Sequence, residues 1–393
     1  MKTKTLVLLL LGWRITLFIV GSLAARFLEY KPSFPYAEAI LLNRNLPIWL
    51  ASWANFDGVH YLTIIEKGYV GTGLIQAFFP LYSLVVAAVS FIPIDPLVLG
   101  LLLSNLAFMA FAITFYRYVN QNYSTKIANW SLVSLLLFPT AFFLGAFYTE
   151  SLFLLVVIAS LWSAQAKKWW LASLFAGLAA ATRLVGIFLI PALLLELLQQ
   201  NMASNKSLRT QLYSTQFYIQ FFKKNLKQIM IILLSSLGLL SYMAYLQLNF
   251  NDPLYFFHVQ SEFGGGRQES LVVLPQVVWR YLKIFITYRP FDLKYFVFVQ
   301  EFVFTTLAYL GVLLAAKKVR WSWTIFSLFA ITLPTLTGTF SSMPRYVLVA
   351  LPLFVLAGTY LSKKSKIWLF FLVASGLLLL CNTILFIQGY WVA

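Results

Sequence analysis

Runs of about 18–20 apolar residues recur along this 393-residue chain from end to end, the length that an α-helix needs to cross a bilayer. Only 10% of the residues are charged, whereas about 25% is usual in soluble domains. A soluble domain could not cover its surface with so few charges, so we exclude a simple globular protein, a disordered chain and a coiled coil. The sequence predicts an all-α polytopic integral membrane protein.

The first apolar run covers residues 5–27 and follows a short basic N-terminus. It is too long for a signal peptide and lacks a clear small-residue cleavage site, so we expect it to be retained as a span. The short runs on either side of Arg183 are also compatible with one kinked helix. We expect about eleven spans in total. Besides the first run, they lie at residues 97–116, 127–145, 148–165, 169–182, 184–198, 229–248, 296–316, 321–338, 345–361 and 367–388.

Two further apolar stretches are less regular than the eleven predicted spans. Residues 77–93 contain two prolines and follow a polar segment, and residues 271–289 carry Arg280 and Lys283 in their middle. Charged side chains are costly at the centre of a bilayer. We therefore expect interfacial or re-entrant helices on the outer face here.

The formal net charge of +17 fits this topology better than it fits nucleic-acid binding, because Lys and Arg gather on the cytoplasmic side of membrane proteins. With the N-terminus cytoplasmic, most basic residues flank the inner ends of the spans, and Glu196 is the one acid there. The chain then forms a single transmembrane domain, residues 1–393. It has a basic cytosolic loop at 201–228 and two long extracytoplasmic loops at 28–96 and 249–295. Such outer loops suit an enzyme that works at the membrane surface.

The first outer loop carries the acid Asp57, followed by Gly58 and, about one helical turn later, by His60. An Asp at this place can cap a helix that begins near Val59. It can also be a general base at the membrane edge, with His60 facing the same site. The sequence leaves both interpretations open.

Three other charged residues lie at outer ends of predicted spans. Glu150 at a helix start can interact with the helix dipole or mark a functional site. Arg183, between two short spans, can extend toward the interface or hold a phosphate, for which its forked guanidinium is suited. Arg345 follows Pro344 at the start of a span and is a second candidate phosphate ligand.

In the second outer loop His258 and Glu262 have the i, i+4 spacing that places two side chains on one helical face. With Gln260 they are better suited to hydrogen-bonding a polar substrate than to holding a metal, because other ligands are few. The chain has one cysteine and two histidines, so a divalent metal has no support in the sequence, and no cofactor is assigned. No nucleotide-binding glycine motif occurs in a strand–helix context.

These residues lie in blocks that resemble the glycosylphosphatidylinositol mannosyltransferase II family (phosphatidylinositol-glycan class V) and its bacterial relatives, within the GT-C superfamily of membrane glycosyltransferases. The chain departs from that pattern at Phe56, where the family usually has Trp. The matching blocks are Phe56-Asp57-Gly-Val-His60-Tyr with Gly68-Tyr69, Ala77-Phe-Phe-Pro80-Leu-Tyr82, Phe147-Tyr148-Thr-Glu150-Ser-Leu-Phe, Ala181-Thr-Arg183-Leu-Val-Gly186, Asp252-Pro-Leu with His258-Val-Gln260, and Met343-Pro-Arg345-Tyr346.

The resemblance implies a GT-C-type fold and the inverting transfer of a hexose, mannose by the family name. The donor it implies is a polyprenyl-phosphate sugar, the acceptor a lipid or glycan, and the place the extracytoplasmic face, with membrane lipids around the protein. Asp57 is then the general base and Arg183 and Arg345 bind the donor phosphate. His60, Glu150, His258 and Gln260 shape the sugar and acceptor site. Short loops favour a bacterial plasma membrane.

A transporter or flippase for a lipid or polar solute is the alternative from another class, and a non-catalytic scaffold is a third. A transporter places its site near the bilayer midplane, between broken helices. Here the acids gather at one outer edge, apart from an isolated Arg14 within the first span. This distribution favours the enzyme.

Overall fold

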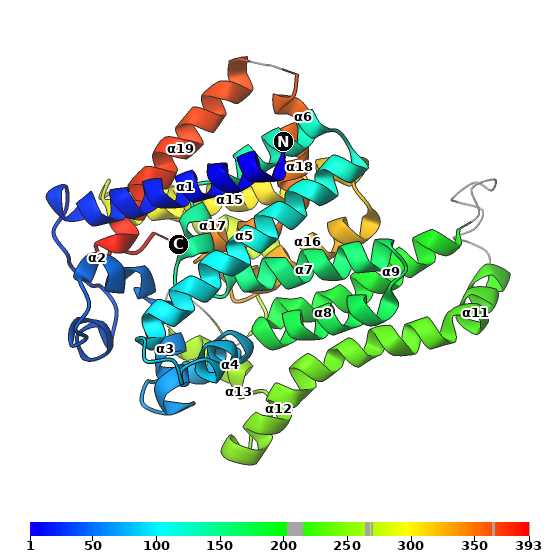
Figure 1. Ribbon diagram of the computed structural model, residues 1–393, viewed down its shortest axis with the longest axis horizontal. Coiled ribbons are helices and arrows are strands. Elements are labelled where there is room, and N and C mark those ends of the chain that lie inside the picture. The colour runs from blue at the N-terminus through cyan, green and yellow to red at the C-terminus, as the bar shows by residue number, and fades with distance from the viewer. Residues whose placement is uncertain (203–214, 264–267, 269, 364–365, 393) are drawn as a thin grey trace.

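The computed structural model of the chain describes residues 1–202, 215–263, 268, 270–363 and 366–392, and within these ranges it contains helices and no strand (Figure 1). The helices are α1 (Thr3–Leu23), α2 (Ile48–Ala51), α3 (Asp57–Lys67), α4 (Leu81–Ala88), α5 (Pro96–Asn122), α6 (Thr125–Leu136), α7 (Glu150–Gln165), α8 (Trp169–Thr182), α9 (Leu189–Asn201), α11 (Thr215–Leu233), α12 (Leu237–Phe250), α13 (Tyr255–His258), α14 (Leu274–Thr287), α15 (Leu293–Ala315), α16 (Trp321–Thr335), α17 (Met343–Tyr346), α18 (Leu351–Leu361) and α19 (Lys366–Ile387).

Six helical segments in this part of the chain are long and apolar enough to cross a membrane: Thr3–Arg26, Pro96–Asn122, Leu184–Asn201, Thr215–Phe250, Leu293–Ala315 and Trp368–Ile387. A bent pair, Met343–Val349 with Leu351–Leu361, makes a seventh if it is one span. The prediction of a helical multi-pass membrane protein is thereby confirmed. Helices occupy all eleven predicted segments, but several of them, such as α6 and α18, are short.

Prolines interrupt two of the predicted spans. The span expected at 127–145 is helical only to Leu136, because Pro139 lacks an amide proton and restricts the residue before it. The span expected at 345–361 is bent by 78° between α17 and α18, where Pro352 is the second residue of the second helix. The predicted continuous helices are wrong at both places.

The two short predicted runs around Arg183 are separate helices. Arg183 has φ −154° and ψ 142°, an extended conformation that ends α8 and precedes a 3-10 turn, Leu184–Phe188. Of the less regular apolar stretches, 77–93 contains α4 and 271–289 contains the amphipathic α14; neither is among the membrane-crossing segments. The predicted basic loop 201–228 is helical from Thr215 onward, while residues 203–214 fall outside the described part of the chain.

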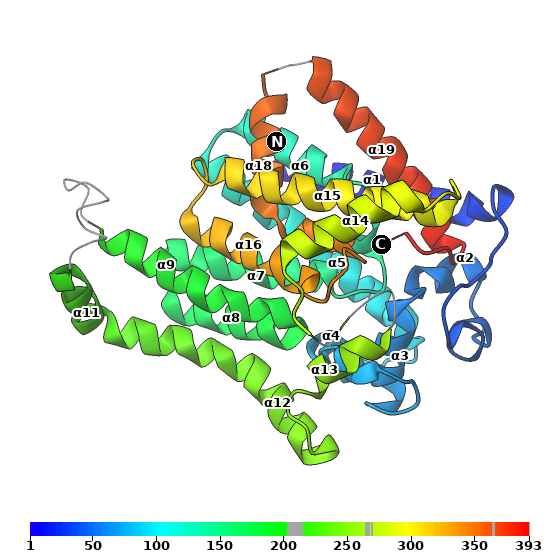
Figure 2. The same cartoon turned by 180° about the vertical axis from the view of Figure 1, so that it is seen from behind.

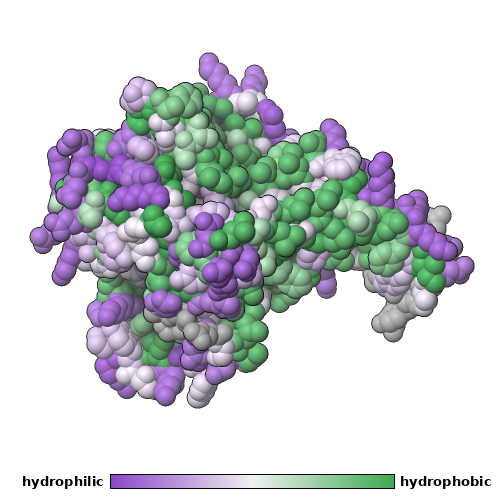
Figure 3. All heavy atoms as spheres, turned by 90° about the horizontal axis from the view of Figure 1, so that it is seen from below, coloured by the Kyte–Doolittle hydropathy of each residue, from purple (hydrophilic) through white to green (hydrophobic). Residues whose placement is uncertain are grey.

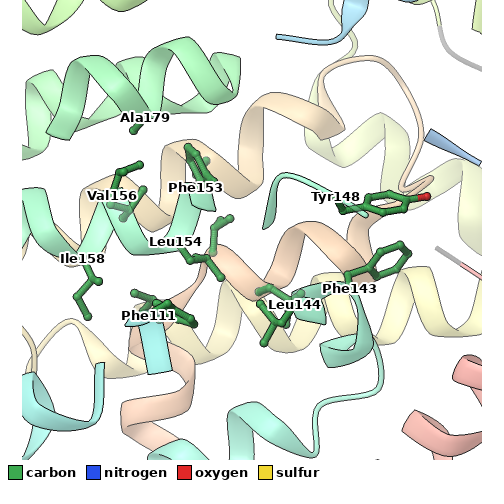
Figure 4. Packing of buried hydrophobic residues seen from close by; sticks show 14 of the residues in the cluster. Phe111, Phe143, Leu144, Tyr148, Phe153, Leu154, Val156, Ile158 and Ala179 are labelled. Atoms are coloured by element: carbon green, nitrogen blue, oxygen red, sulfur yellow. The ribbon is translucent and has the colours of Figure 1, made fainter. Parts of the chain in front are cut away.

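The centre of the molecule is the antiparallel pair of α7 and α8. Figure 4 shows Phe153 and Val156 of α7 pointing toward Ala179 of α8. Small residues on α8, among them Ala172 and Ala179 at 0% exposure, let the two helices approach closely, as membrane helices require. The packed pair fixes the positions of its two ends, which carry Glu150 and Arg183.

The loops that carry the predicted site residues gather at one end of the molecule. In both ribbon views α3, α4 and α13 lie together, far from the C-terminal end of α9 and the N-terminal end of α11 (Figures 1 and 2). The C-terminal end also joins this group, because the amides of Lys31 and Ser33 donate to the carbonyls of Gln388 and Gly389. From below, hydrophobic side chains cover much of the body and hydrophilic ones gather toward its two ends (Figure 3).

Candidate functional site

A cavity of about 1080 Å³ opens among residues of the segment 33–79, the break between α8 and α9, the segment around α13, and helices α16 and α17. Segments far apart in the sequence therefore meet around one space, large enough for a sugar phosphate. Six of the seven predicted site residues line it: Asp57, His60, Arg183, His258, Gln260 and Arg345. The seventh, Glu150, lies behind the two arginines and does not line the cavity.

Asp57 is the first residue of α3, so the helix begins earlier than the predicted start near Val59. The capping position belongs to Phe56, whose φ of +60° is unusual for a non-glycine residue. Tyr148 holds this turn: its Oη accepts from the Asp57 amide at 3.2 Å and donates to the Asn55 carbonyl at 2.7 Å. The carboxylate of Asp57 is 22% exposed and accepts from Nη1 of Arg345 at 2.6 Å.

Arg345 comes from α17, which follows Ser342 in a left-handed conformation. Its guanidinium has three neighbours of different kinds: Nη1 faces Asp57, Nη2 donates to Oη of Tyr346 at 3.3 Å, and Nε lies 3.5 Å from Oε1 of Glu150. Aromatic rings surround it, with Tyr148 at 5.4 Å. The side chain is 6% exposed, so charged neighbours are required to offset its desolvation.

Glu150 joins the two arginines. It begins α7, is 3% exposed, and its Oε1 accepts from Nη1 of Arg183 at 2.7 Å. Its Oε2 has no hydrogen-bond partner within the described residues. The extended backbone at Arg183 turns that side chain across the end of α8, where its guanidinium also lies 5.1 Å from the ring of Tyr346. The four side chains thus form a row of alternating charge, in the order Asp57, Arg345, Glu150 and Arg183. We call it the charge row, and its net charge is zero.

His60 lies on α3, on the cavity wall beside Asp57. Its Nδ1 is 3.2 Å from Oγ1 of Thr72, and its ring stacks on Phe78 with centroids 4.6 Å apart. Burial lowers the pKa of His60, and the nearby Asp57 carboxylate offsets part of that shift. The imidazole is therefore neutral at neutral pH and can orient a hydroxyl by hydrogen bonding.

His258 and Gln260 line the cavity from α13 and the turn that follows it. Nδ1 of His258 pairs with Oδ2 of Asp252 at 2.7 Å, and Gln260 donates to the carbonyl of Phe256 at 3.1 Å. His258 and Glu262, expected on one helical face, both line the cavity, although α13 ends at His258 and the chain continues as a 3-10 turn, Val259–Phe263. The His258 side chain is 56% exposed and can reach a ligand from the cavity mouth.

Sequence reasoning did not find the aromatic wall beside Asp57. Phe34, Phe56 and Trp391 all line the cavity; ring centroids lie 4.6 Å apart between Phe34 and Phe56, and 5.2 Å apart between Phe56 and Trp391. Trp391 belongs to the C-terminal tail, and no local pattern links it to the first loop. Tyr148 was given no role either, although it stands in the same motif block as Glu150, two positions earlier.

The side of the cavity beyond the arginines is apolar. Leu184 and Val185 from the break after α8 face it together with Leu333 and Pro334 of α16. Phe329, one turn earlier on α16, is 40% exposed on the outer surface. A molecule with a charged head and a hydrocarbon chain fits this combination of a charge row and an apolar wall.

Among the described residues, no group of three or more His, Cys, Asp and Glu side chains is arranged to hold a metal ion. No protein-family model matches this chain, and no curated protein matches it either.

Proposed function

We propose that this protein is a GT-C-type membrane glycosyltransferase that moves a hexose, mannose by the resemblance, from a polyprenyl-phosphate donor to a lipid or glycan acceptor. The observation that carries the proposal is the cavity, in which the carboxylate of Asp57 pairs with Arg345, and Arg183 and an apolar wall line the same space. A lipid-linked sugar phosphate needs these three elements: a base for the acceptor, cations for the phosphate and an apolar path for the chain.

Asp57 takes the proton of the acceptor hydroxyl as that oxygen attacks the anomeric carbon of the donor. The bond between the anomeric carbon and the phosphate oxygen breaks, and its electron pair leaves with the polyprenyl phosphate. Because attack comes from the face opposite the phosphate, the configuration at the anomeric carbon is inverted. Arg183 and Arg345 stabilise the negative charge that develops on the leaving phosphate.

The remaining site residues hold the substrates in place. Neutral His60, together with His258 and Gln260, offers hydrogen bonds to sugar hydroxyls, while Glu150 holds both arginines from behind. The aromatic wall of Phe34, Phe56 and Trp391 is suited to pack against a sugar ring of the acceptor. Leu184, Val185 and Leu333 give the donor chain an apolar surface.

The orientation that we propose has eleven spans, a cytoplasmic N-terminus and the cavity on the extracytoplasmic face of a bacterial plasma membrane. The N-terminal amine lies at Tyr116, near the end of α5, and the C-terminal tail lies at the first loop. These contacts support opposite ends for the two termini. Cysteine labelling tests this orientation in a Cys381→Ser background. We expect Val70→Cys to be labelled from outside the cell and Lys168→Cys to be labelled only after permeabilisation.

Transfer in proteoliposomes tests the function. The purified full chain is reconstituted and given a panel of radiolabelled polyprenyl-phosphate hexoses with membrane lipid extract as acceptor. We expect one donor to lose its sugar to an acceptor, with release of polyprenyl phosphate and inversion at the anomeric carbon. Movement of a labelled lipid across the bilayer without transfer would favour a flippase instead.

A further inference from the structure

Arg345 is the member of the charge row that is shared between Asp57 and the rest of the cavity. Its Nη1 bonds Asp57 at 2.6 Å, while Nε and Nη2 lie near Glu150 and Tyr346. Nη1 and Nη2 thus each donate one hydrogen bond, whereas Nε, 3.5 Å from Oε1 of Glu150, has no hydrogen-bond partner within the described residues. The positive charge of the guanidinium is already shared between the carboxylates of Asp57 and Glu150, so an anion that enters the cavity beside Arg345 competes with them for that charge.

We propose that the donor phosphate and Asp57 compete for Arg345, so that donor binding loosens the Asp57–Arg345 ion pair and makes Asp57 available as a base. This inference rests on the proposed function, because it assumes a phosphate-bearing donor. A carboxylate paired with a guanidinium accepts a proton less readily than a free one. The side chain of Arg345 is only 6% exposed, so water screens the attraction between Arg345 and Asp57 weakly. The pairing therefore opposes protonation of Asp57 more strongly than a surface ion pair would.

Of its neighbours, Asp57 is the one from which Arg345 is most readily drawn. Glu150 is 3% exposed and is tied to Arg183 at 2.7 Å, so it stays behind the arginines. Asp57 is 22% exposed and lines the cavity, so water or an acceptor hydroxyl can replace the guanidinium as its partner. Competition from the phosphate therefore acts on the Asp57 bond.

The charge balance of the reaction fits this sharing. The charge row is neutral, and a phosphodiester donor adds one negative charge. When the acceptor oxygen bonds the anomeric carbon, its proton neutralises Asp57, while the departing phosphate gains the electron pair of the broken bond. The negative charge thus moves from one side of Arg345 to the other, and the total in the cavity is unchanged.

Equilibrium binding of farnesyl phosphate to the purified full-length protein tests the coupling without any transfer step. Asp57→Asn keeps the shape of the side chain and removes its charge. We expect this variant to bind farnesyl phosphate about tenfold more tightly than wild type, within the roughly 5–150-fold range of coupled sites. Asp95→Asn, whose carboxylate pairs with Arg44 outside the cavity, is the matched control and should not change the affinity.

Loss of simple charge repulsion between Asp57 and the phosphate would also tighten binding. The Asp57→Asn substitution is therefore also made in an Arg345→Gln background. Competition predicts that most of the gain in affinity disappears there, whereas an equal or larger gain in that background, or no gain in either background, overturns the inference.

If Arg345→Gln does not fold, calorimetry of the wild type and of Asp57→Asn in two buffers of different ionisation enthalpy replaces the binding comparison. We then expect more proton uptake on binding in wild type than in Asp57→Asn at pH 5; equal uptake overturns the inference. Absence of farnesyl phosphate binding to wild type would overturn the proposed function as well.

Discussion

Two buried clusters of carboxylate and guanidinium groups lie at opposite ends of the helical bundle, and they differ in what surrounds them. At the end away from the cavity, Glu196 of α9 is 1% exposed and accepts from Arg320, from Ser322 Oγ at 2.8 Å and from Gln200 at 2.7 Å. Both of its carboxylate oxygens have donors. This cluster joins α9 to the start of α16.

The charge row has the same residue types but a different setting. Oε2 of Glu150 lacks a partner within the described residues, Asp57 is partly exposed, and three of its four members line a cavity. Fully bonded groups at a helix junction serve the fold, whereas partly bonded groups that face a cavity can bind and react. We therefore expect substitutions at the two clusters to separate activity from stability.

The largest expected effect is on the transfer rate of Asp57→Asn. Loss of a general base typically lowers a rate by about 10²–10⁴-fold. Asn preserves the shape at the start of α3 and Glu150 still neighbours Arg345, so the variant should fold and express, with a lower unfolding temperature because Arg345 loses one of its two carboxylate neighbours. Glu196→Gln, made for comparison, should keep its transfer rate within a few-fold. Near-normal transfer by Asp57→Asn would remove the base assignment.

The second prediction concerns unfolding of Glu150→Gln. This change leaves Arg345, 6% exposed, and Arg183, 15% exposed, with one carboxylate between them, and breaking a buried pair typically costs about 3–5 kcal/mol. Glu196→Gln should cost less, roughly 1–3 kcal/mol, because Arg320 is 29% exposed and can turn to water. Chemical denaturation in detergent measures both values, and a larger cost at Glu196 would contradict the comparison.

A smaller effect is expected for Trp391→Ala. If the aromatic wall packs against the acceptor, loss of this ring should raise the acceptor KM by roughly 2- to 10-fold, as about 0.5–1.5 kcal/mol of aromatic contact implies. The KM for the donor should stay unchanged. Trp170→Ala, whose side chain is 62% exposed away from the cavity, is the control. An equal change in the KM of both substrates would argue against a separate acceptor wall.

The smallest effect concerns the pH dependence of folding at His60. Its lowered pKa means that the folded chain binds a proton there less readily than the unfolded chain, whose histidine has a pKa of about 6.5. The free energy of unfolding should therefore fall as the pH drops below about 6.5, until the folded form is protonated too. His60→Gln should remove this part of the pH dependence. Unfolding midpoints at pH 7.5, 6.5 and 5.5 that change equally in both proteins would refute it.

The sequence predicted where helices lie and which charged residues meet at one cavity, because apolar runs have a fixed length requirement and charges are rare among them. It also contained Pro139 and Pro352, which explain the breaks in two expected spans. The pairing of Asp57 with Arg345 was not predictable, because the partners are 288 positions apart and either interpretation of Asp57 fitted its local pattern. The place of Trp391 depends on how the C-terminal tail packs against the first loop, which no periodicity records.

Photo-crosslinking with a diazirine-bearing farnesyl phosphate tests most directly the claim that the charge row, and not the Glu196 cluster, receives a lipid phosphate. The account predicts adducts on peptides that contain Val185, Leu333 or Tyr346, reduced by unlabelled farnesyl phosphate and by Arg345→Gln, but not by Arg320→Gln. Adducts spread evenly over the exposed helices, or concentrated near Glu196 and insensitive to Arg345→Gln, would contradict it.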